Sequence, residues 1–130
     1  MSKYFRALPP KPLAPYWHDS EDRKIFIAAT KDKGWTREYV VKYNKAGSYV
    51  RVGFAKPQER LALEFLPARQ LTDMELGRRA RRELALSSQG WKIVYLQPTS
   101  DGKLLLVGSY DGAMIAKLLM QIFGSRLEVI

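Results

Sequence analysis

The chain has 130 residues, 46% of them hydrophobic, which suits one ordinary domain with a real core rather than a disordered chain. Its 22 Lys and Arg against 13 Asp and Glu give a net charge of +9, which points to an anionic partner, most often nucleic acid. The absence of cysteine excludes disulfides and thiolate metal sites, and no apolar run is long enough to predict a membrane span or a secretion signal.

Residues 1–23 read as an N-terminal arm, followed by a single domain over 24–130. Its prolines disfavour a helix and favour an extended chain: Pro9, Pro10, Pro12 and Pro15. Its aromatic residues are Tyr4, Phe5, Tyr16 and Trp17. Three roles stay open for the arm: a strap along the domain, a cover over a ligand, or a proline-rich motif for a partner protein.

The next region predicts a four-strand antiparallel meander, because short runs of β-formers alternate with turn residues. The expected strands are 24–31, 36–44, 49–55 and 60–66. In the third strand, Tyr49 and Arg51 share the face opposite Val50 and Val52. In the second strand, Tyr39, Val41 and Tyr43 share a face that is either core or an exposed stacking platform. Aromatic residues on strands are more often core, which favours the inward arrangement.

Residues 71–90 form the clearest predicted helix. Thr72 and Glu75 have the spacing of a capping box, and Gly90 is placed to end the helix. At about 100° per residue a small and apolar stripe forms on one side; its members are Leu76, Gly77, Ala80, Leu84 and Ser87. We expect this stripe to lie on the sheet and the four arginines at 78, 79, 81 and 82 to face solvent or a partner. Glu75 can pair with Arg78 or Arg79, and Arg79 with Glu83.

The C-terminal part predicts a hairpin of two buried strands over 91–97 and 103–110, then a helix over 113–123 and a last strand over 126–130. Only Lys117 and Gln121 are polar in that helix, so we expect it to be almost wholly buried or to face a subunit partner. A homo-oligomer could form through 113–123 and the last strand. The predicted fold is α+β, with a mainly antiparallel sheet and helices packed on one face.

Catalysis is not expected, because the residue inventory does not support it. His18 is the single histidine and lies in the arm, so neither a zinc site nor a Ser–His–acid set can be assembled around it. Asp19, Glu21 and Asp22 are better explained as a solvated acidic loop than as a divalent-ion site. We therefore predict no catalytic residue, no metal and no cofactor.

Binding is better supported, because cations and aromatic rings alternate along the first half of the chain, the combination that single-strand binders use. The candidate nucleic-acid-binding residues are Lys31, Lys33, Trp35, Arg37, Lys42, Tyr43, Lys45, Tyr49, Arg51, Lys56, Arg78 and Arg82. Trp35 follows Gly34 at an expected hairpin tip, where it would either contact bases or pack over the sheet edge.

The sequence thus predicts a non-catalytic, cytoplasmic protein, nucleoid-associated if it binds nucleic acid, with single-stranded DNA or RNA as its favoured partner. The order of four antiparallel strands and a helix is similar to sheet-and-helix single-strand binders, such as the Whirly and PUR-type domains and the ThermoDBP proteins of thermophilic archaea. That Asn44 is the sole asparagine is a weak mark of a thermophile. The alternative function is an assembly or adaptor subunit that uses the proline-rich arm and the apolar C-terminal helix.

Overall fold

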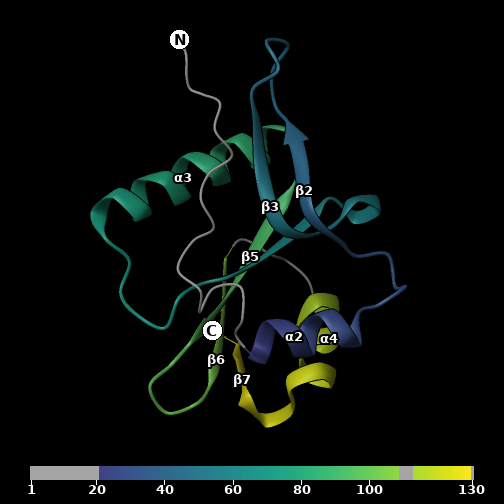
Figure 1. The fold of residues 1–130 in the computed structure, drawn as a ribbon, viewed down its shortest axis with the longest axis vertical. Coiled ribbons are helices and arrows are strands. Elements are labelled where there is room, and N and C mark those ends of the chain that lie inside the picture. The colour runs from purple at the N-terminus through teal and green to yellow at the C-terminus, as the bar shows by residue number, and fades with distance from the viewer. Residues whose placement is uncertain (1–20, 109–112, 130) are drawn as a thin grey trace.

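The computed structural model describes residues 21–108 and 113–129, with the backbone alone at 113 and 114. In chain order the elements are α2 (Glu21–Ala29), β2 (Thr36–Lys42), β3 (Tyr49–Lys56), β4 (Leu61–Phe65), α3 (Asp73–Ser88), β5 (Lys92–Pro98), β6 (Leu104–Gly108), α4 (Ala113–Phe123) and β7 (Leu127–Val129) (Figure 1). The predicted arm lies outside the described residues except for its last three, which begin α2.

The six strands form one mixed sheet in the order β2-β3-β4-β5-β6-β7. The pairs β2–β3, β3–β4 and β5–β6 are antiparallel, whereas β4–β5 and β6–β7 are parallel. Each parallel pair needs a long crossover, which α3 and α4 provide. The α+β class is therefore confirmed, but the meander has three strands rather than four. The order of four strands and a helix, on which the likeness to Whirly and PUR-type domains rested, is not present.

The first predicted strand, 24–31, is wrong, because this segment belongs to helix α2. Glu21 and Asp22 occupy its first turn, where acidic side chains are favourable. Phe26 and Ile27 face the core, and the buried Thr30 donates its hydroxyl to the carbonyl of Phe26 at 2.7 Å. Arg23, Phe26, Ile27 and Thr30 follow helical spacing, a pattern that begins before the predicted strand does.

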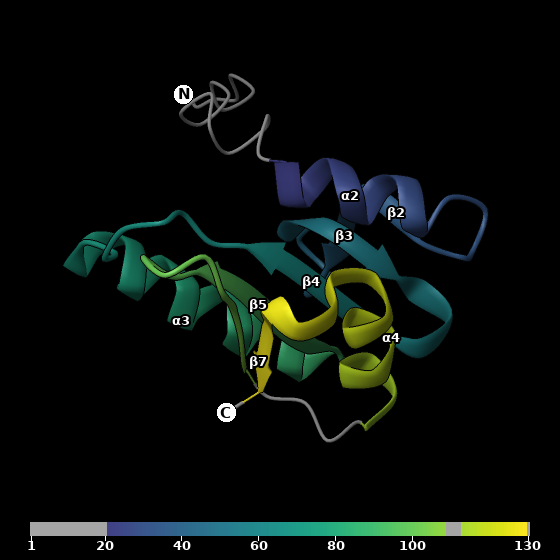
Figure 2. The same ribbon diagram turned by 90° about the horizontal axis from the view of Figure 1, so that it is seen from below.

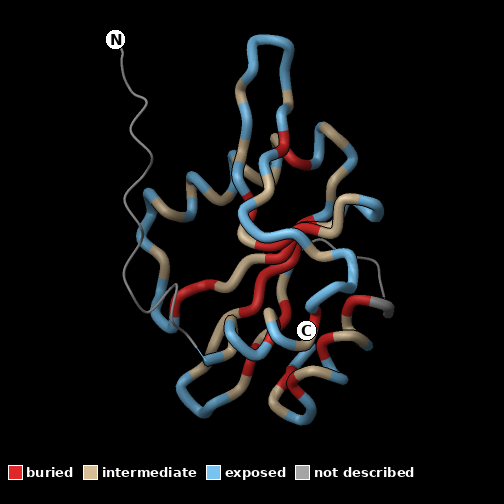
Figure 3. Tube along the Cα trace, turned by 45° about the vertical axis from the view of Figure 1, so that its right-hand side comes forward, coloured by how far each residue is buried: buried red, intermediate tan, exposed pale blue. Residues whose placement is uncertain are grey.

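The helices pack on both faces of the sheet, not on one. Along β5, Val94 and Leu96 pack in the core beneath α2 and α4, whereas Ile93 and Tyr95 pack in the core beneath α3. Figures 1 and 2 show α3 separated from the other two helices by strands of the sheet. Burial on both faces explains the continuous apolar run of β5. The burial is concentrated in the central strands (Figure 3).

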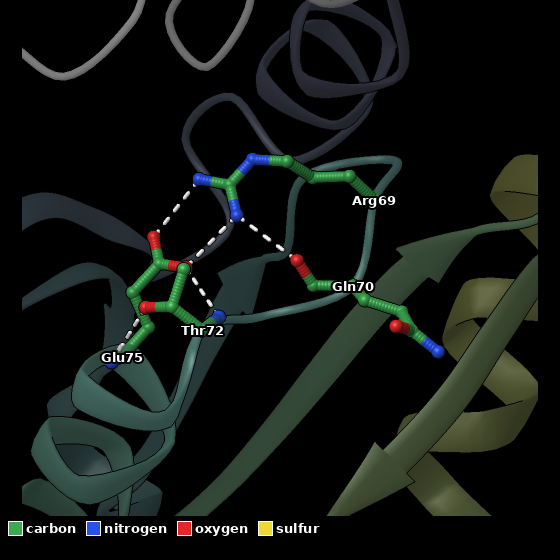
Figure 4. Close-up of polar contacts among 4 residues, drawn as sticks. All are labelled: Arg69, Gln70, Thr72 and Glu75. Atoms are coloured by element: carbon green, nitrogen blue, oxygen red, sulfur yellow. Dashed lines mark hydrogen bonds and ion pairs between the residues drawn. The ribbon is translucent and has the colours of Figure 1, made fainter.

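The predicted start of α3 is confirmed. Thr72 Oγ1 accepts from the Glu75 amide at 3.2 Å, and Glu75 Oε1 accepts from the Thr72 amide at 2.9 Å, which completes the capping box (Figure 4). Arg69 adds two hydrogen bonds to the Glu75 carboxylate, at 2.8 and 2.9 Å. The pairing of Glu75 is thus with Arg69, outside the helix, rather than with Arg78 or Arg79. The predicted Arg79–Glu83 pair is present at 3.2 Å.

The predicted orientation of α3 is wrong. Leu76 and Leu84 are 46% and 73% exposed, and Ala80 is exposed as well. The side that faces the sheet instead carries Leu86, which is fully buried, together with Arg79, Arg82 and Glu83. The polar side faces inward because polar groups of the sheet beneath it need hydrogen-bond and ion-pair partners, which Arg82 provides.

Helix α4 buries one side rather than nearly all of its surface. Ile115, Leu119 and Phe123 pack against the sheet, whereas Met120 is 55% exposed. Strand β7 pairs with β6 of its own sheet. The apolar composition of α4 is therefore explained by the core of this chain.

Candidate nucleic-acid interface

The candidate interface is the β2–β3 hairpin, whose turn end extends beyond the body of the molecule (Figures 1 and 3). The β3–β4 pairing begins only at Phe54, so 49–53 have no partner in β4. Asn44 orders the turn, because its side-chain oxygen accepts from the Ser48 amide at 2.9 Å. Gly47 has a φ of +91°, a left-handed conformation that favours glycine. The hairpin is thus a two-stranded ribbon with a defined turn.

The hairpin changes its orientation at Gly53. Val52 belongs to the core beneath α3, whereas Phe54, two residues later, belongs to the core beneath α2 and α4. In a regular strand these side chains would share a face. Glu38, which lies between the Arg37–Phe54 and Tyr39–Val52 pairs, has a φ of +53°. The strong local twist at this point turns the free part of the hairpin toward α3.

A polar network stabilises the twist where β3 leaves β4. The Gly53 amide donates to Glu64 Oε1 at 3.1 Å, and Glu64 Oε2 pairs with Arg82 of α3. Arg82 Nη2 also donates to the carbonyl of Arg51 at 2.7 Å. These contacts satisfy backbone groups that would otherwise be left open at the edge of β3. A Cβ atom at Gly53 would lie 2.9 Å from Glu64 Oε1, so a larger residue there would displace the Glu64 carboxylate.

The inner face of the hairpin is core. Val41 and Val52 are buried, and Tyr39 is half-buried with its ring 5.6 Å from the Trp91 ring. The carbonyl of Tyr43 accepts from Gln89 at the end of α3 at 3.3 Å. The inward alternative for the second predicted strand is therefore the one observed. These contacts hold the hairpin against α3, and its opposite face is exposed among the described residues.

That opposite face, which we call the hairpin outer face, consists of Val40, Lys42, Tyr49 and Arg51, all of them exposed. Lys42 lies directly opposite Tyr49, and Val40 directly opposite Arg51. Directly opposed side chains have Cβ atoms about 5 Å apart. The Tyr49 ring, 54% exposed, therefore lies between a lysine across the ladder and an arginine two residues along its own strand.

The charge of the hairpin is strongly one-sided. Between Thr36 and Lys56 the chain carries five Lys or Arg and one acid, Glu38. Glu38 is directed toward Arg23 of α2, 3.8 Å away. Among the described residues, Lys42, Lys45 and Arg51 make no ion pair with a carboxylate. The outer face and the turn thus present positive charge that this part of the chain does not neutralise.

The structure does not bring all the predicted residues to this face. Lys31 and Lys33 are exposed in the loop between α2 and β2. This loop is at the end of β2 opposite the hairpin turn, about 20 Å away, because a strand rises roughly 3.3 Å per residue. Arg37, also exposed, lies at that end of the strand. Trp35 is not at a hairpin tip, because the segment before it is helical. Its ring packs edge-on against Phe26, with the ring centroids 5.2 Å apart. Of the two alternatives for Trp35, packing over the sheet is therefore the one observed.

Four other predicted residues have different surroundings. Lys56 is paired with Glu59 at 2.8 Å, and Arg82 is engaged in the network below α3. Tyr43 is half-buried, and Arg78 is exposed on α3 with its guanidinium 3.2 Å from the Met74 sulfur. Lys42, Lys45, Tyr49 and Arg51 therefore remain as the group that the fold gathers.

The prediction missed Val40. It is 40% exposed beside Arg51 and adds an apolar surface next to the guanidinium. The sequence contained a signal for the exposure of Val40. Glu38 and Lys42, two residues away on either side, share its face of the strand, and charged residues on a face indicate that it points outward.

No family model, curated protein or solved structure matches this chain. In the described residues no helix is both long and apolar enough to cross a membrane. Within the same residues no three His, Cys, Asp or Glu side chains are grouped so as to hold a metal ion. Asp22, from the acidic segment considered above, is instead paired with Arg126 at 2.7 Å.

Proposed function

We propose that this protein binds single-stranded nucleic acid, without catalysing a reaction, through the hairpin outer face. One observation carries the proposal: an exposed Tyr49 ring is flanked by Lys42 and Arg51 on a face that none of the described helices covers. A ring offers a surface on which an unpaired base can stack, and the two cations lie where the phosphates on either side of that base can run.

Single strands fit this face better than duplex DNA does. Bases inside a duplex are already stacked and cannot reach the Tyr49 ring. Reading a duplex through α3 would leave only Arg78 and Arg81 of its four arginines for the groove, because Arg79 and Arg82 are both paired with carboxylates inside the fold. The hairpin could instead enter a major groove as a ribbon, and the experiment separates that arrangement from stacking.

The test is a fluorescence-anisotropy titration of labelled oligothymidine against a duplex of equal length at several salt concentrations. Stacking on one ring contributes about 1–3 kcal/mol, so Tyr49→Ala should weaken binding by roughly 5- to 150-fold. Tyr49→Phe keeps the ring and should bind like the wild type.

With Lys42, Lys45 and Arg51 on the phosphates, log K should fall with log salt at a slope of about −2, and Arg51→Ala should reduce the magnitude of that slope by about 0.7.

Lys117→Ala is the matched control, because Lys117 is exposed on α4 and its removal lowers the net charge equally. It should leave affinity and slope close to those of the wild type. If Lys117→Ala and Arg51→Ala weaken binding alike, binding reflects net charge and not this face. If duplex and single strand bind equally and Tyr49→Ala has no effect, the stacking proposal is wrong.

Assembly with another protein is a second candidate function. It is favoured by a different observation, the exposed apolar surface of α3 at Leu76 and Leu84.

A further inference from the structure

Helix α3 exposes the side that amphipathicity predicts to be buried. Leu76 and Leu84 are 46% and 73% exposed, and Gly77 and Ala80 lie between them on the same side. We call these four residues the α3 outer stripe. The polar network beneath α3 accounts for the inward side. On the outer stripe the two leucines are exposed, and the Arg81 side chain reaches over Gly77, with Nη1 3.5 Å from where a Cβ atom at Gly77 would lie.

The outer stripe has the shape of a notch between two projections. Leu76 and Leu84 are eight residues apart, about 12 Å along a helix that rises 1.5 Å per residue. Between them lie Gly77, over which the Arg81 side chain reaches, and Ala80, whose side chain is a methyl group. Helices pack by inserting the side chains of one into the gaps of the other, and small residues let the two backbones approach. A crossing helix with one large apolar side chain at its centre fits this surface.

One edge of the outer stripe is basic, whereas the exposed Asp73 lies at its N-terminal end. Arg78 and Arg81 are exposed along one edge, and neither pairs with a carboxylate within the described part of the chain. A partner that carries Asp or Glu beside its apolar side chains would complement this edge, and the net charge of +9 favours the same sign of partner at longer range.

Two other occupants fit less well. A second copy, placed antiparallel so that Leu76 meets Leu84, would bring the two Arg81 edges together, and like charges at an interface are unfavourable. A lipid bilayer would have to accept Asp73, which lies within about 20° of Ala80 and Leu84 at 3.6 residues per turn. Burying that carboxylate at the depth of the leucines is costly.

We infer that the α3 outer stripe docks an amphipathic helix of another protein, with apolar residues at i, i+3 or i+4 and i+7 and acidic residues along one flank. The inference is independent of the proposed nucleic-acid function, because Leu76 and Leu84 take no part in the hairpin outer face. Leu84→Ser should therefore leave oligonucleotide affinity unchanged.

The experiment is a selection from a display library of helical peptides, randomised on one face, for binding to the full chain. Enriched peptides should carry the apolar spacing and acidic flank described above. They should bind Leu84→Ser and Leu76→Ser at least tenfold more weakly than the wild type, and Arg78→Ala/Arg81→Ala several-fold more weakly at low salt. Met120→Ser is the matched control, because it removes an exposed apolar side chain from α4, and it should bind like the wild type.

Three results would overturn the inference. The first is a selection that enriches nothing, or enriches peptides that bind Leu84→Ser as tightly as the wild type. The second is binding to vesicles of phosphatidylcholine with phosphatidylglycerol that Leu84→Ser abolishes, which would assign the stripe to lipid. The third is a concentration-dependent dimer in analytical ultracentrifugation that Leu84→Ser dissociates, which would assign it to a second copy.

Discussion

Helices α3 and α4 occupy equivalent places in the sheet, since each connects a pair of parallel strands, but they use their sides in opposite ways. Helix α4 packs Ile115, Leu119 and Phe123 against an unbroken apolar surface that includes Leu104 and Leu106. Helix α3 lies over the point where β3 leaves β4, and there it presents Arg82 and Glu83. The polar needs of the sheet beneath a helix can therefore outweigh the helix's own apolar stripe in setting its orientation.

The largest expected effect contrasts one leucine from each helix. Leu119 of α4 is fully buried, so Leu119→Ala should lower the free energy of unfolding by about 2–5 kcal/mol through lost burial and the cavity left behind. Leu84 of α3 is 73% exposed, so Leu84→Ala should change it by no more than about 0.5 kcal/mol. Urea denaturation of both variants measures the difference, and equal losses would contradict the orientation of α3.

The next largest effect is expected from breaking the polar network that sets the orientation of α3. Glu64→Ala removes the acceptor of the Gly53 amide and the partner of Arg82, and it should cost about 1–3 kcal/mol in the free energy of unfolding. Glu59→Ala, which removes a more exposed pair with Lys56, should cost about 0–1 kcal/mol and is the matched control. Urea denaturation again gives both values, and a Glu64→Ala loss no larger than the control's would contradict a structural role for the network.

The existence and start of α3 could be predicted from the sequence because its cap is local, with Thr72 and Glu75 three residues apart. Its orientation could not, because the acid that holds Arg82 is Glu64, 18 residues upstream on a strand. Amphipathicity counts apolar residues on each side of the helix and takes no account of partners that only the fold provides.

The candidate interface shows the same division. The outward placement of Tyr49 and Arg51 could be predicted because alternation along a strand fixes which residues share a face. The placement of Trp35 could not, since it depended on reading 24–31 as a strand when the segment is helical. The parallel β4–β5 pair was missed although its signal was present, because a helix between two strands is typical of a parallel crossover.

A smaller effect tests the buried part of the α3 contact. Tyr95 donates its hydroxyl to Glu83 at 3.2 Å, and its ring lies 4.1 Å from the Arg79 guanidinium. Tyr95→Phe keeps the ring and removes the hydrogen bond, so it should cost about 0.5–1.5 kcal/mol. Burial, and then the Glu83 carboxylate, raises the pKa of Tyr95 above its usual range.

The raised pKa of Tyr95 makes stability depend on alkaline pH. A folded pKa above the unfolded value favours the folded state below about pH 10, and that contribution is lost as the pH rises further. Urea denaturation from pH 8 to 11 should show a smaller decline in Tyr95→Phe than in the wild type, and identical declines would contradict the buried environment of the phenol.

The smallest effect concerns the start of α3, where polar groups again hold the helix. The hydrogen bonds from Arg69, and then from the Thr72 backbone, lower the pKa of Glu75 from 4.5 to about 2. Because the folded pKa lies below the unfolded one, the contribution of Glu75 is present above about pH 4.5 and is lost as the pH falls toward 2. Carboxyl NMR titration should give a midpoint near pH 2 for Glu75, and Arg69→Gln should move it upward. Glu75→Gln should lose less stability than the wild type between pH 5 and 2. A Glu75 midpoint near 4.5 in the wild type would contradict an ionic contribution of Arg69 to the cap of α3.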